Sequence, residues 1–188
     1  YLTGAPATGK STVSEQIRER VDKCSVFSYG SELTAICRQR HGNHVEQDDL
    51  RRRSADMILR EDVEATDRQL VELAAVARSR NHLIIDSHPV TKERYGFRIT
   101  PFDRASLTAI NPDAIVVLYA DPRVIIDRIS KNSGGRPSVS EFETLIHETL
   151  QQSIAIDYSL MVPAPIYFLD SGRPLDEVVD DFLGLFGF

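Results

Sequence analysis

The sequence predicts an α/β domain in which a parallel sheet carries helices on both faces. Strand-like and helix-like patterns alternate along the whole chain, which is the order expected of connected β-α units. The strand-like runs are continuously apolar, as expected for strands that helices cover on both faces. The length of 188 residues fits one domain, over residues 1–188, with a core large enough to fold without disulfides.

Five short segments have the composition of buried strands. The first is cut short, because only Tyr1-Leu2-Thr3 precede the first glycine and the chain has no initiator methionine. We therefore expect that a few native residues precede Tyr1. The other four strands are expected over residues 24–28, 82–86, 114–120 and 164–170.

Apolar residues spaced three or four apart predict the helices between these strands. Val13, Ile17 and Val21 form such a stripe directly after the first strand. A long helix is expected over residues 54–79 and another over 121–131, where Asp121-Pro122 is a typical helix start. Two further stripes predict the last helices: Phe142, Leu145, Ile146, Thr149 and Leu150, then Leu175, Val178, Val179, Phe182, Leu183 and Phe186.

Three segments have no clear period and are expected to be irregular. They cover residues 42–49, 89–112 and 132–137. Long loops at the carboxyl edge of a parallel sheet usually carry function, so these segments are candidates for substrate contacts.

The most informative segment is Gly4-Ala5-Pro6-Ala7-Thr8-Gly9-Lys10-Ser11, which fits the phosphate-loop pattern G-x-x-x-x-G-K-[ST] at every fixed position. Glycines allow a tight turn whose N–H groups point at phosphate oxygens, and the next helix presents its positive end to the same anion. In this pattern Lys10 contacts the β- and γ-phosphates and Ser11 binds Mg²⁺. The segment through Thr12 is the expected triphosphate site, with a glycine-rich turn and an incidental lysine as the alternative.

Two side chains at the end of the third strand are candidates for metal and substrate contacts. In phosphate-loop folds an aspartate at such a strand end faces the Mg²⁺ of the bound triphosphate, so Asp86 is expected to be a metal ligand. The alternative is an aspartate that only stabilises a turn. His88 follows at the ligand-binding edge of the sheet, where it could orient a phosphate or a hydroxyl, or form only a local hydrogen bond.

Two groups of arginines have the charge that phosphoryl transfer requires, because negative charge spreads over the transferring oxygens. Arg128, Lys131 and Arg136 surround a glycine pair, and an arginine on such a loop is suited to close over phosphates. Arg51 lies in the run Asp48-Asp49-Leu50-Arg51-Arg52-Arg53 and could clamp a phosphate-bearing acceptor. For each group the alternative is a solvated surface charge.

Composition argues against several classes of function. The formal net charge of -6 argues against a general nucleic-acid binder. No apolar run reaches membrane-spanning length and no secretory signal is visible. Cys24 and Cys37 lack Cys-x-x-Cys spacing, so neither a disulfide nor a zinc site is expected, and the reducing cytoplasm is the simplest location. Metal-ligand spacing is also absent from the remaining histidines, His41, His44, His82 and His147.

These motifs resemble those of archaeal-type adenylate kinases, within the group of P-loop nucleoside monophosphate kinases. Beyond the phosphate loop, the resemblance rests on four parts of the chain: Phe27-Ser28-Tyr29-Gly30, Asp48-Asp49-Leu50-Arg51, Ile85-Asp86-Ser87-His88, and the run from Asn111-Pro112-Asp113 through Ala120-Asp121-Pro122 to Arg128. It covers most of the chain, and the last two parts are the most discriminating. It implies a P-loop kinase fold with a five-stranded parallel sheet, a helical acceptor-binding segment over about residues 30–60, and a short lid over about 131–140.

The resemblance also implies an activity and roles for the site residues. The activity is transfer of the γ-phosphoryl group of MgATP to AMP, with ATP and Mg²⁺ bound at the phosphate loop. By position, Gly30, Arg51 and His88 fall on the acceptor side. Arg128 and Arg136 fall on the lid side, where they would act in catalysis with Lys10. Ser171 and Gly172 match the loop that lies against the adenine.

Other functions stay open at this point. A P-loop kinase for a nucleoside, a sugar or another metabolite would have the same triphosphate site. An ATP-binding protein with only slow ATP hydrolysis would share it too. The sequence also leaves open whether the chain forms homo-oligomers.

Overall fold

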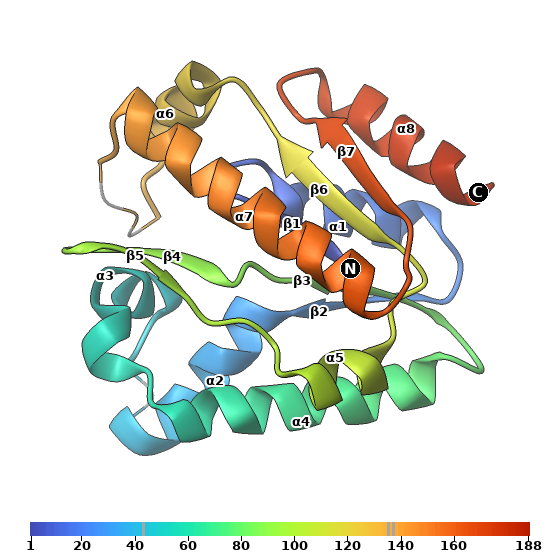
Figure 1. The fold of residues 1–188 in the computed structure, drawn as a ribbon, viewed down its shortest axis with the longest axis horizontal. Coiled ribbons are helices and arrows are strands. Elements are labelled where there is room, and N and C mark those ends of the chain that lie inside the picture. Colours follow the sequence, from blue (N-terminus) through green and yellow to red (C-terminus); the bar gives the residue numbers. More distant parts are fainter. Residues whose placement is uncertain (43, 135, 137) are drawn as a thin grey trace.

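Five parallel strands form the centre of the protein (Figure 1). In the computed structural model, which describes residues 1–42, 44–134, 136 and 138–188, the strand order is β2-β3-β1-β6-β7. These pairings are all parallel, so the predicted five-stranded sheet is confirmed. The strands are β1 (Leu2–Gly4), β2 (Cys24–Ser28), β3 (His82–Asp86), β6 (Ile115–Tyr119) and β7 (Ile166–Asp170).

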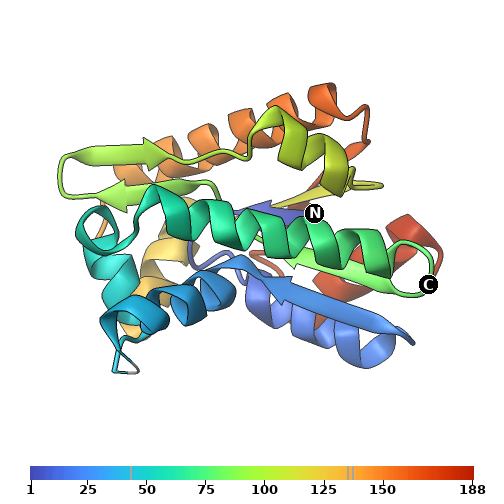
Figure 2. The ribbon, with the colours of Figure 1, turned by 90° about the horizontal axis from the view of Figure 1, so that it is seen from below.

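Helices cover both faces of this sheet: α1 (Lys10–Arg20) and α8 (Leu175–Phe186) on one, α4 (Arg60–Ala77), α5 (Arg104–Ile110) and α7 (Glu141–Met161) on the other (Figures 1 and 2). Alternate strand residues enter the two layers, so Val116 packs with the first group and Val117 with the second. Burial on both faces explains why the strands are continuously apolar. In the described part of the chain, none of the helices combines the length and hydrophobicity needed to cross a membrane.

Beyond the carboxyl end of β2, the expected acceptor segment contains α2 (Tyr29–His41) and α3 (Gln47–Met57). The structure differs from the sequence expectation in two ways. Helix α3 begins within the segment 42–49 that we expect to be irregular, and the single helix expected over 54–79 is divided between α3 and α4. The carboxylate of Asp62 explains the division, since it accepts a hydrogen bond from the N–H of Leu59 at 2.8 Å and so caps a new helix start.

Most of residues 89–112 belong to regular elements, contrary to expectation. β4 (Val90–Glu93) and β5 (Gly96–Ile99) form an antiparallel hairpin separate from the main sheet, and α5 follows. Figure 2 shows the hairpin extending beside α3, and β4 also contacts α7. Its strands carry charged residues and are short, so hydrophobic periodicity does not reveal them. The hairpin borders the carboxyl edge of the main sheet.

Helix α7 is confirmed, but its apolar stripe does not face the core. Phe142 and Leu145 are 71% and 54% exposed. The residues that α7 buries near the site are instead mostly polar: Thr144, His147, Glu148 and Gln151.

Hydrogen bonds to the β4-β5 hairpin and to the main sheet explain this inverted burial. The Nε2 atom of His147 lies 3.0 Å from the carbonyl oxygen of Val90. The N–H of Ala120 donates to Glu148 at 3.1 Å, and the Gln151 amide donates to the hydroxyl of Thr3 at 2.6 Å. Buried polar groups are tolerated when they are paired, so α7 is oriented by these bonds against the apolar pattern of its sequence.

Candidate active site

The loop between β1 and α1, which we call the phosphate loop (residues 4–11), has a backbone that requires glycine. Gly4 has a φ of 150°, and a Cβ atom there would strike the carbonyl oxygen of Leu118 on β6. Gly9 precedes α1 with a φ of 92°, in the left-handed region. The hydroxyl of Thr8 donates to the carbonyl of Ala5 at 2.8 Å and closes the turn. The free N–H groups at the start of α1 are therefore available to an anion.

Lys10 folds back across the phosphate loop. Its Nζ atom donates to the carbonyl oxygens of Gly4 at 2.8 Å and Ala5 at 3.1 Å. Burial lowers the pKa of Lys10 to about 8; Asp86 opposes this shift, and Arg136 and Arg51 add to it. A bound anion would favour the charged ammonium, because an opposite charge close to a buried cation offsets its loss of hydration.

Ser11 and Asp86 meet as the sequence predicts. The Ser11 hydroxyl donates to the Asp86 carboxylate at 2.8 Å, and Asp86 is buried at the end of β3. The described residues contain no cluster of three or more His, Cys, Asp or Glu side chains that could hold a metal ion by themselves. A hydroxyl beside a carboxylate nevertheless fits Mg²⁺, which prefers oxygen ligands and takes the rest of its shell from water and phosphate.

A cavity of about 200 Å³ lies over the phosphate loop, and we call it the donor cavity. It brings together the phosphate loop, the end of β3, the starts of α2 and α3, and the expected lid. Residues 135 and 137 of that lid, and residue 43 of the acceptor segment, lie outside the described residues. The predicted site residues that line the cavity are Ala5, Pro6, Ala7, Gly9, Lys10, Ser11, Thr12, Gly30, Arg51, Asp86, His88 and Arg136.

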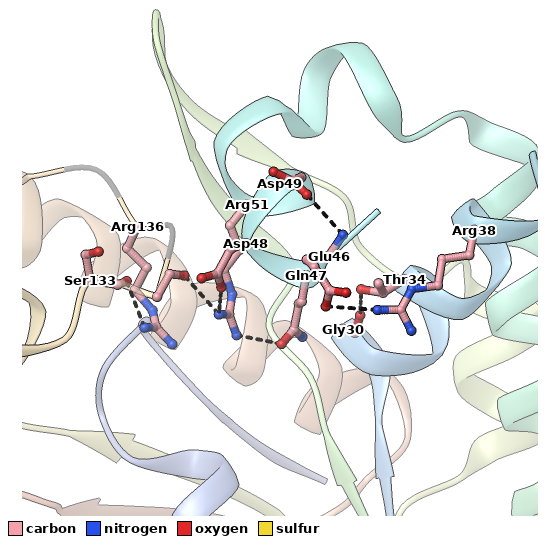
Figure 3. A network of polar contacts seen from close by, with 11 residues as sticks. Gly30, Thr34, Arg38, Glu46, Gln47, Asp48, Asp49, Arg51, Ser133 and Arg136 are labelled. Atoms are coloured by element: carbon pink, nitrogen blue, oxygen red, sulfur yellow. Dashed lines mark hydrogen bonds and ion pairs between the residues drawn. The ribbon is translucent and has the colours of Figure 1, made fainter. Parts of the chain in front are cut away.

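Two arginines reach the donor cavity from different segments. Figure 3 shows Arg51 of α3 and Arg136 of the expected lid with their guanidinium groups near each other. Arg51 donates to the carbonyl of Gly134 at 3.0 Å, and Arg136 donates to the carbonyl of Ser133 at 3.1 Å. Burial, followed by the charge of Arg51, lowers the pKa of Arg136. Like charges that converge in a partly buried site are unfavourable alone and favour an anion between them.

A second cavity of about 340 Å³ lies under α2, α3 and α4, and we call it the acceptor cavity. It joins the donor cavity, because five residues line both: Gly30, Gln47, Arg51, His88 and Thr91. Gln47 was not among the expected site residues. Its side-chain oxygen accepts a hydrogen bond from Arg51 at 2.9 Å and holds the guanidinium at the junction (Figure 3).

Two histidines lie close to the cations of the donor cavity. Burial holds the pKa of His88 well below its ordinary value, and the charge of Lys10 adds to this effect. His88 is therefore neutral and can donate or accept a hydrogen bond at the junction. His147 also lines the donor cavity. Sequence reasoning missed it, because a single histidine on a helix has no spacing that marks a site.

His147 makes a testable contribution to stability. Burial lowers its pKa from 6.5 to about 4, with the Val90 hydrogen bond opposing the shift and Lys10 and Lys92 adding to it. Below pH 6.5 the unfolded chain takes up the proton first, so acid favours unfolding. We expect the free energy of unfolding to fall by up to about 3 kcal/mol as the pH drops toward 4. Urea titrations of wild type and His147→Gln at several pH values measure this fall in the free energy of unfolding.

The glutamine variant should show a shallower pH dependence, because its amide can still donate to Val90 but does not titrate in this range. His44→Gln is the matched control, since His44 is exposed. An equal slope in His147→Gln and wild type would show that His147 does not contribute.

Arg128 and the loop after β7 lie outside both cavities. Arg128 donates to the carbonyls of Ala7 at 3.2 Å and Ser171 at 2.7 Å, so it ties the phosphate loop to the end of β7. Gly172 is exposed, and its N–H donates to Asp170 at 2.8 Å. The structure therefore places Arg128, Ser171 and Gly172 next to the phosphate loop without bringing them into the donor cavity.

Comparison with known families supports the assignment of the loop. A family model described as an AAA domain matches residues 3–145, from β1 into α7. The chain belongs to this AAA-domain family. The match contains the phosphate loop, Arg51, Asp86, His88 and Arg136, so the candidate site lies within the AAA domain.

Sequence similarity to individual relatives covers nearly the whole chain. An adenylate kinase of Thermococcus onnurineus is 24% identical over 186 residues, which are 97% of this chain and 91% of that protein. An adenylate kinase of Methanopyrus kandleri is also 24% identical, over 96% of this chain and 93% of that protein. The predicted resemblance to archaeal adenylate kinases is thus confirmed at low identity.

The solved structures show a kinase fold. The shikimate kinase of Bacteroides thetaiotaomicron superposes with a TM-score of 0.57 at 15% identity, over 100% of this chain and 97% of that chain. At that identity the likeness concerns the fold alone. By family the chain is thus an AAA-domain protein, and its fold is that of the P-loop kinases.

Proposed function

We propose that the protein is a nucleoside monophosphate kinase that transfers the γ-phosphoryl group of MgATP to its acceptor, with AMP as the first candidate. The observation that carries this proposal is the junction of the two cavities at Arg51 and His88. A phosphate loop opens there into a second cavity whose entrance carries a permanent positive charge. The relatives named adenylate kinases support the same activity.

On the donor side, the chain would bind and orient the triphosphate. The N–H groups of the phosphate loop would surround the β-phosphate, and Lys10 would exchange its bonds to the carbonyls of Gly4 and Ala5 for phosphate oxygens. Ser11 and Asp86 would hold Mg²⁺, which neutralises charge on the phosphate oxygens. Arg128 would keep the phosphate loop in place through the carbonyl of Ala7.

On the acceptor side, Arg51 would bind the monophosphate at the junction, and neutral His88 would donate a hydrogen bond to it. A phosphate oxygen of the acceptor would then attack the γ-phosphorus in line, while the bond from that phosphorus to the β,γ-bridging oxygen breaks. ADP leaves with the electron pair of that bond, and no covalent enzyme intermediate forms. Arg136 would stabilise the charge that spreads over the transferring oxygens.

Replacing Arg51 with alanine should raise the KM for the monophosphate. The change removes a charge-assisted hydrogen bond to the acceptor phosphate, so we expect an increase of about 10- to 100-fold. The KM for ATP should change much less. A coupled assay of ADP formation measures the first KM with varied acceptor at saturating MgATP, and the second with varied MgATP at saturating acceptor.

Arg53→Ala is the matched control, because Arg53 belongs to the same basic run but is exposed and lines neither cavity. If the two variants raise the KM for the acceptor equally, the effect is one of general charge and Arg51 does not bind the phosphate.

The decisive test of the proposal is an acceptor panel. AMP, CMP, GMP, UMP and dTMP are each supplied with MgATP, and diphosphate formation is followed. Preferential phosphorylation of AMP would support adenylate kinase activity. ADP formation that does not depend on any added monophosphate would contradict the kinase proposal and indicate a slow ATPase.

A second candidate is a kinase for another small metabolite. The observation that favours it is the fold shared with a protein named shikimate kinase, since one fold can serve different acceptors. Turnover with none of the five monophosphates, together with intact ATP binding, would support this candidate.

A further inference from the structure

The inner part of the acceptor cavity differs in character from its entrance. Arg51 and His88 lie at the entrance, which the donor cavity shares. The inner walls, which line the acceptor cavity only, include the rings of Tyr29 and Phe102 and the carboxylate of Asp67. Arg60 and Arg98 also line the acceptor cavity only, so its interior holds aromatic rings, one acid and two further cations behind the entrance at Arg51.

The aromatic side chains of the interior pack against one another and give the cavity an apolar lining. The centroids of the Tyr29 and Phe102 rings are 5.8 Å apart, and Tyr158 lies 5.8 Å beyond Phe102. The rings are fixed by their contacts with one another and by hydrogen bonds: the Tyr158 hydroxyl accepts one from the N–H of Phe102 at 2.7 Å. Rigid aromatic walls of this kind bind a flat heterocycle with little loss of side-chain entropy.

Asp67 is the only carboxylate among the described residues that line the acceptor cavity. It lies on α4 and is 8% exposed. The Tyr29 hydroxyl donates to its Oδ1 atom at 2.7 Å, while Oδ2 accepts no hydrogen bond from the described residues. Burial raises the pKa of Asp67, and the Tyr29 hydrogen bond opposes that shift. A buried acid with an open acceptor atom is stabilised by a ligand that supplies an N–H donor.

We propose that Asp67 selects the base of the acceptor nucleotide by accepting a hydrogen bond from an exocyclic amino group. This inference rests on the proposed function, since it requires that the acceptor be a nucleoside monophosphate. With the phosphate at Arg51, the base enters the aromatic interior and its amino group meets the Oδ2 atom of Asp67. Tyr29 occupies the other oxygen and thereby fixes the orientation of the carboxylate.

The chemistry distinguishes amino-bearing bases from their oxo analogues. Adenine and cytosine present N–H donors from an amino group, whereas hypoxanthine and uracil carry a carbonyl oxygen at the same ring position. A carbonyl oxygen facing a carboxylate places two acceptors against each other and leaves both unpaired. Selection of this kind needs a buried acid. Beside an exposed acid, water would donate hydrogen bonds to the carbonyl oxygen and remove the penalty.

Matched pairs of acceptors test this inference: AMP against IMP, and CMP against UMP. The measured quantity is kcat/KM with saturating MgATP for wild type and for Asp67→Asn. We expect wild type to prefer the amino-bearing member by about 10- to 100-fold, the typical cost of losing a hydrogen bond to a charged group. Asp67→Asn should abolish or invert the preference, because its amide can keep the Tyr29 bond and present an N–H to an oxo group.

Glu64→Gln is the control, since it removes an exposed acid from the same helix and should keep the wild-type preference. Asp67→Ser provides a second variant if Asp67→Asn does not fold, and it should also lose the preference. Equal use of AMP and IMP by wild type, or an unchanged ratio in the folded Asp67 variants, would overturn the inference while leaving the proposed function intact. If wild type phosphorylates no monophosphate, both fail together.

Discussion

Replacing Arg136 with alanine should lower kcat by about 10³- to 10⁵-fold, the range expected when an arginine that stabilises a phosphoryl-transfer transition state is removed. Arg136 lines the donor cavity, where its charge helps to lower the pKa of Lys10 and the charge of Arg51 helps to lower the pKa of Arg136. The charge that Arg136 would stabilise is greatest in the transition state. ATP binding, which also uses the phosphate loop and Lys10, should weaken much less.

Steady-state kinetics with MgATP and the best monophosphate, together with calorimetric titration of a non-hydrolysable ATP analogue, separate the two effects. Arg123→Ala is the control, because Arg123 is exposed on α6 (Pro122–Lys131) and pairs with Glu141 outside the cavity. Turnover of Arg136→Ala equal to that of wild type would remove Arg136 from the mechanism.

Replacing Gly4 with alanine should destabilise the protein and abolish triphosphate binding. The new methyl group would strike the carbonyl oxygen of Leu118, which belongs to a buried central strand and cannot easily move. Overpacking of this kind costs about 1–3 kcal/mol, and the unfavourable φ adds about 1–3 kcal/mol. Any relief by movement of the loop would misplace the N–H groups that bind phosphate.

Urea unfolding and calorimetric titration with the ATP analogue measure these two losses. Gly184→Ala on α8 is the control of opposite sign: a Cβ there meets no atom within 4 Å, so the helix should gain about 0.5–1 kcal/mol. A Gly4→Ala protein with wild-type stability and affinity would contradict the structural role assigned to Gly4.

The parts of the site that were predictable are those encoded in consecutive residues. The phosphate loop has a fixed spacing, and Asp86 ends an unmistakable strand, so their contact through Ser11 could be expected. Parallel strands place their carboxyl ends at one edge, which is why residues far apart in the chain could be assigned to one site.

The parts that were not predictable depend on tertiary contacts. Helix α7 buries His147 and Gln151 because backbone and side-chain groups of other strands bind them, and no periodicity of α7 itself records those partners. Arg128 was expected to act on the lid side, but the position of its guanidinium depends on two carbonyl groups, at Ala7 and Ser171. In the sequence Asp67 is an ordinary helix acid. Its contact with Tyr29 and its place in the acceptor cavity follow only from tertiary packing.

The convergence of Lys10, Arg51 and Arg136 has a consequence for how substrates arrive. The protein as a whole carries a formal charge of -6, so its outer surface repels nucleotides at a distance. The donor cavity has the opposite sign, since these three cations line it with Asp86 as an opposing acid. We therefore expect the cations of the donor cavity to attract an approaching phosphate toward the site. This attraction acts over about 10 Å at an ionic strength of about 0.1 M and weakens as the ionic strength rises.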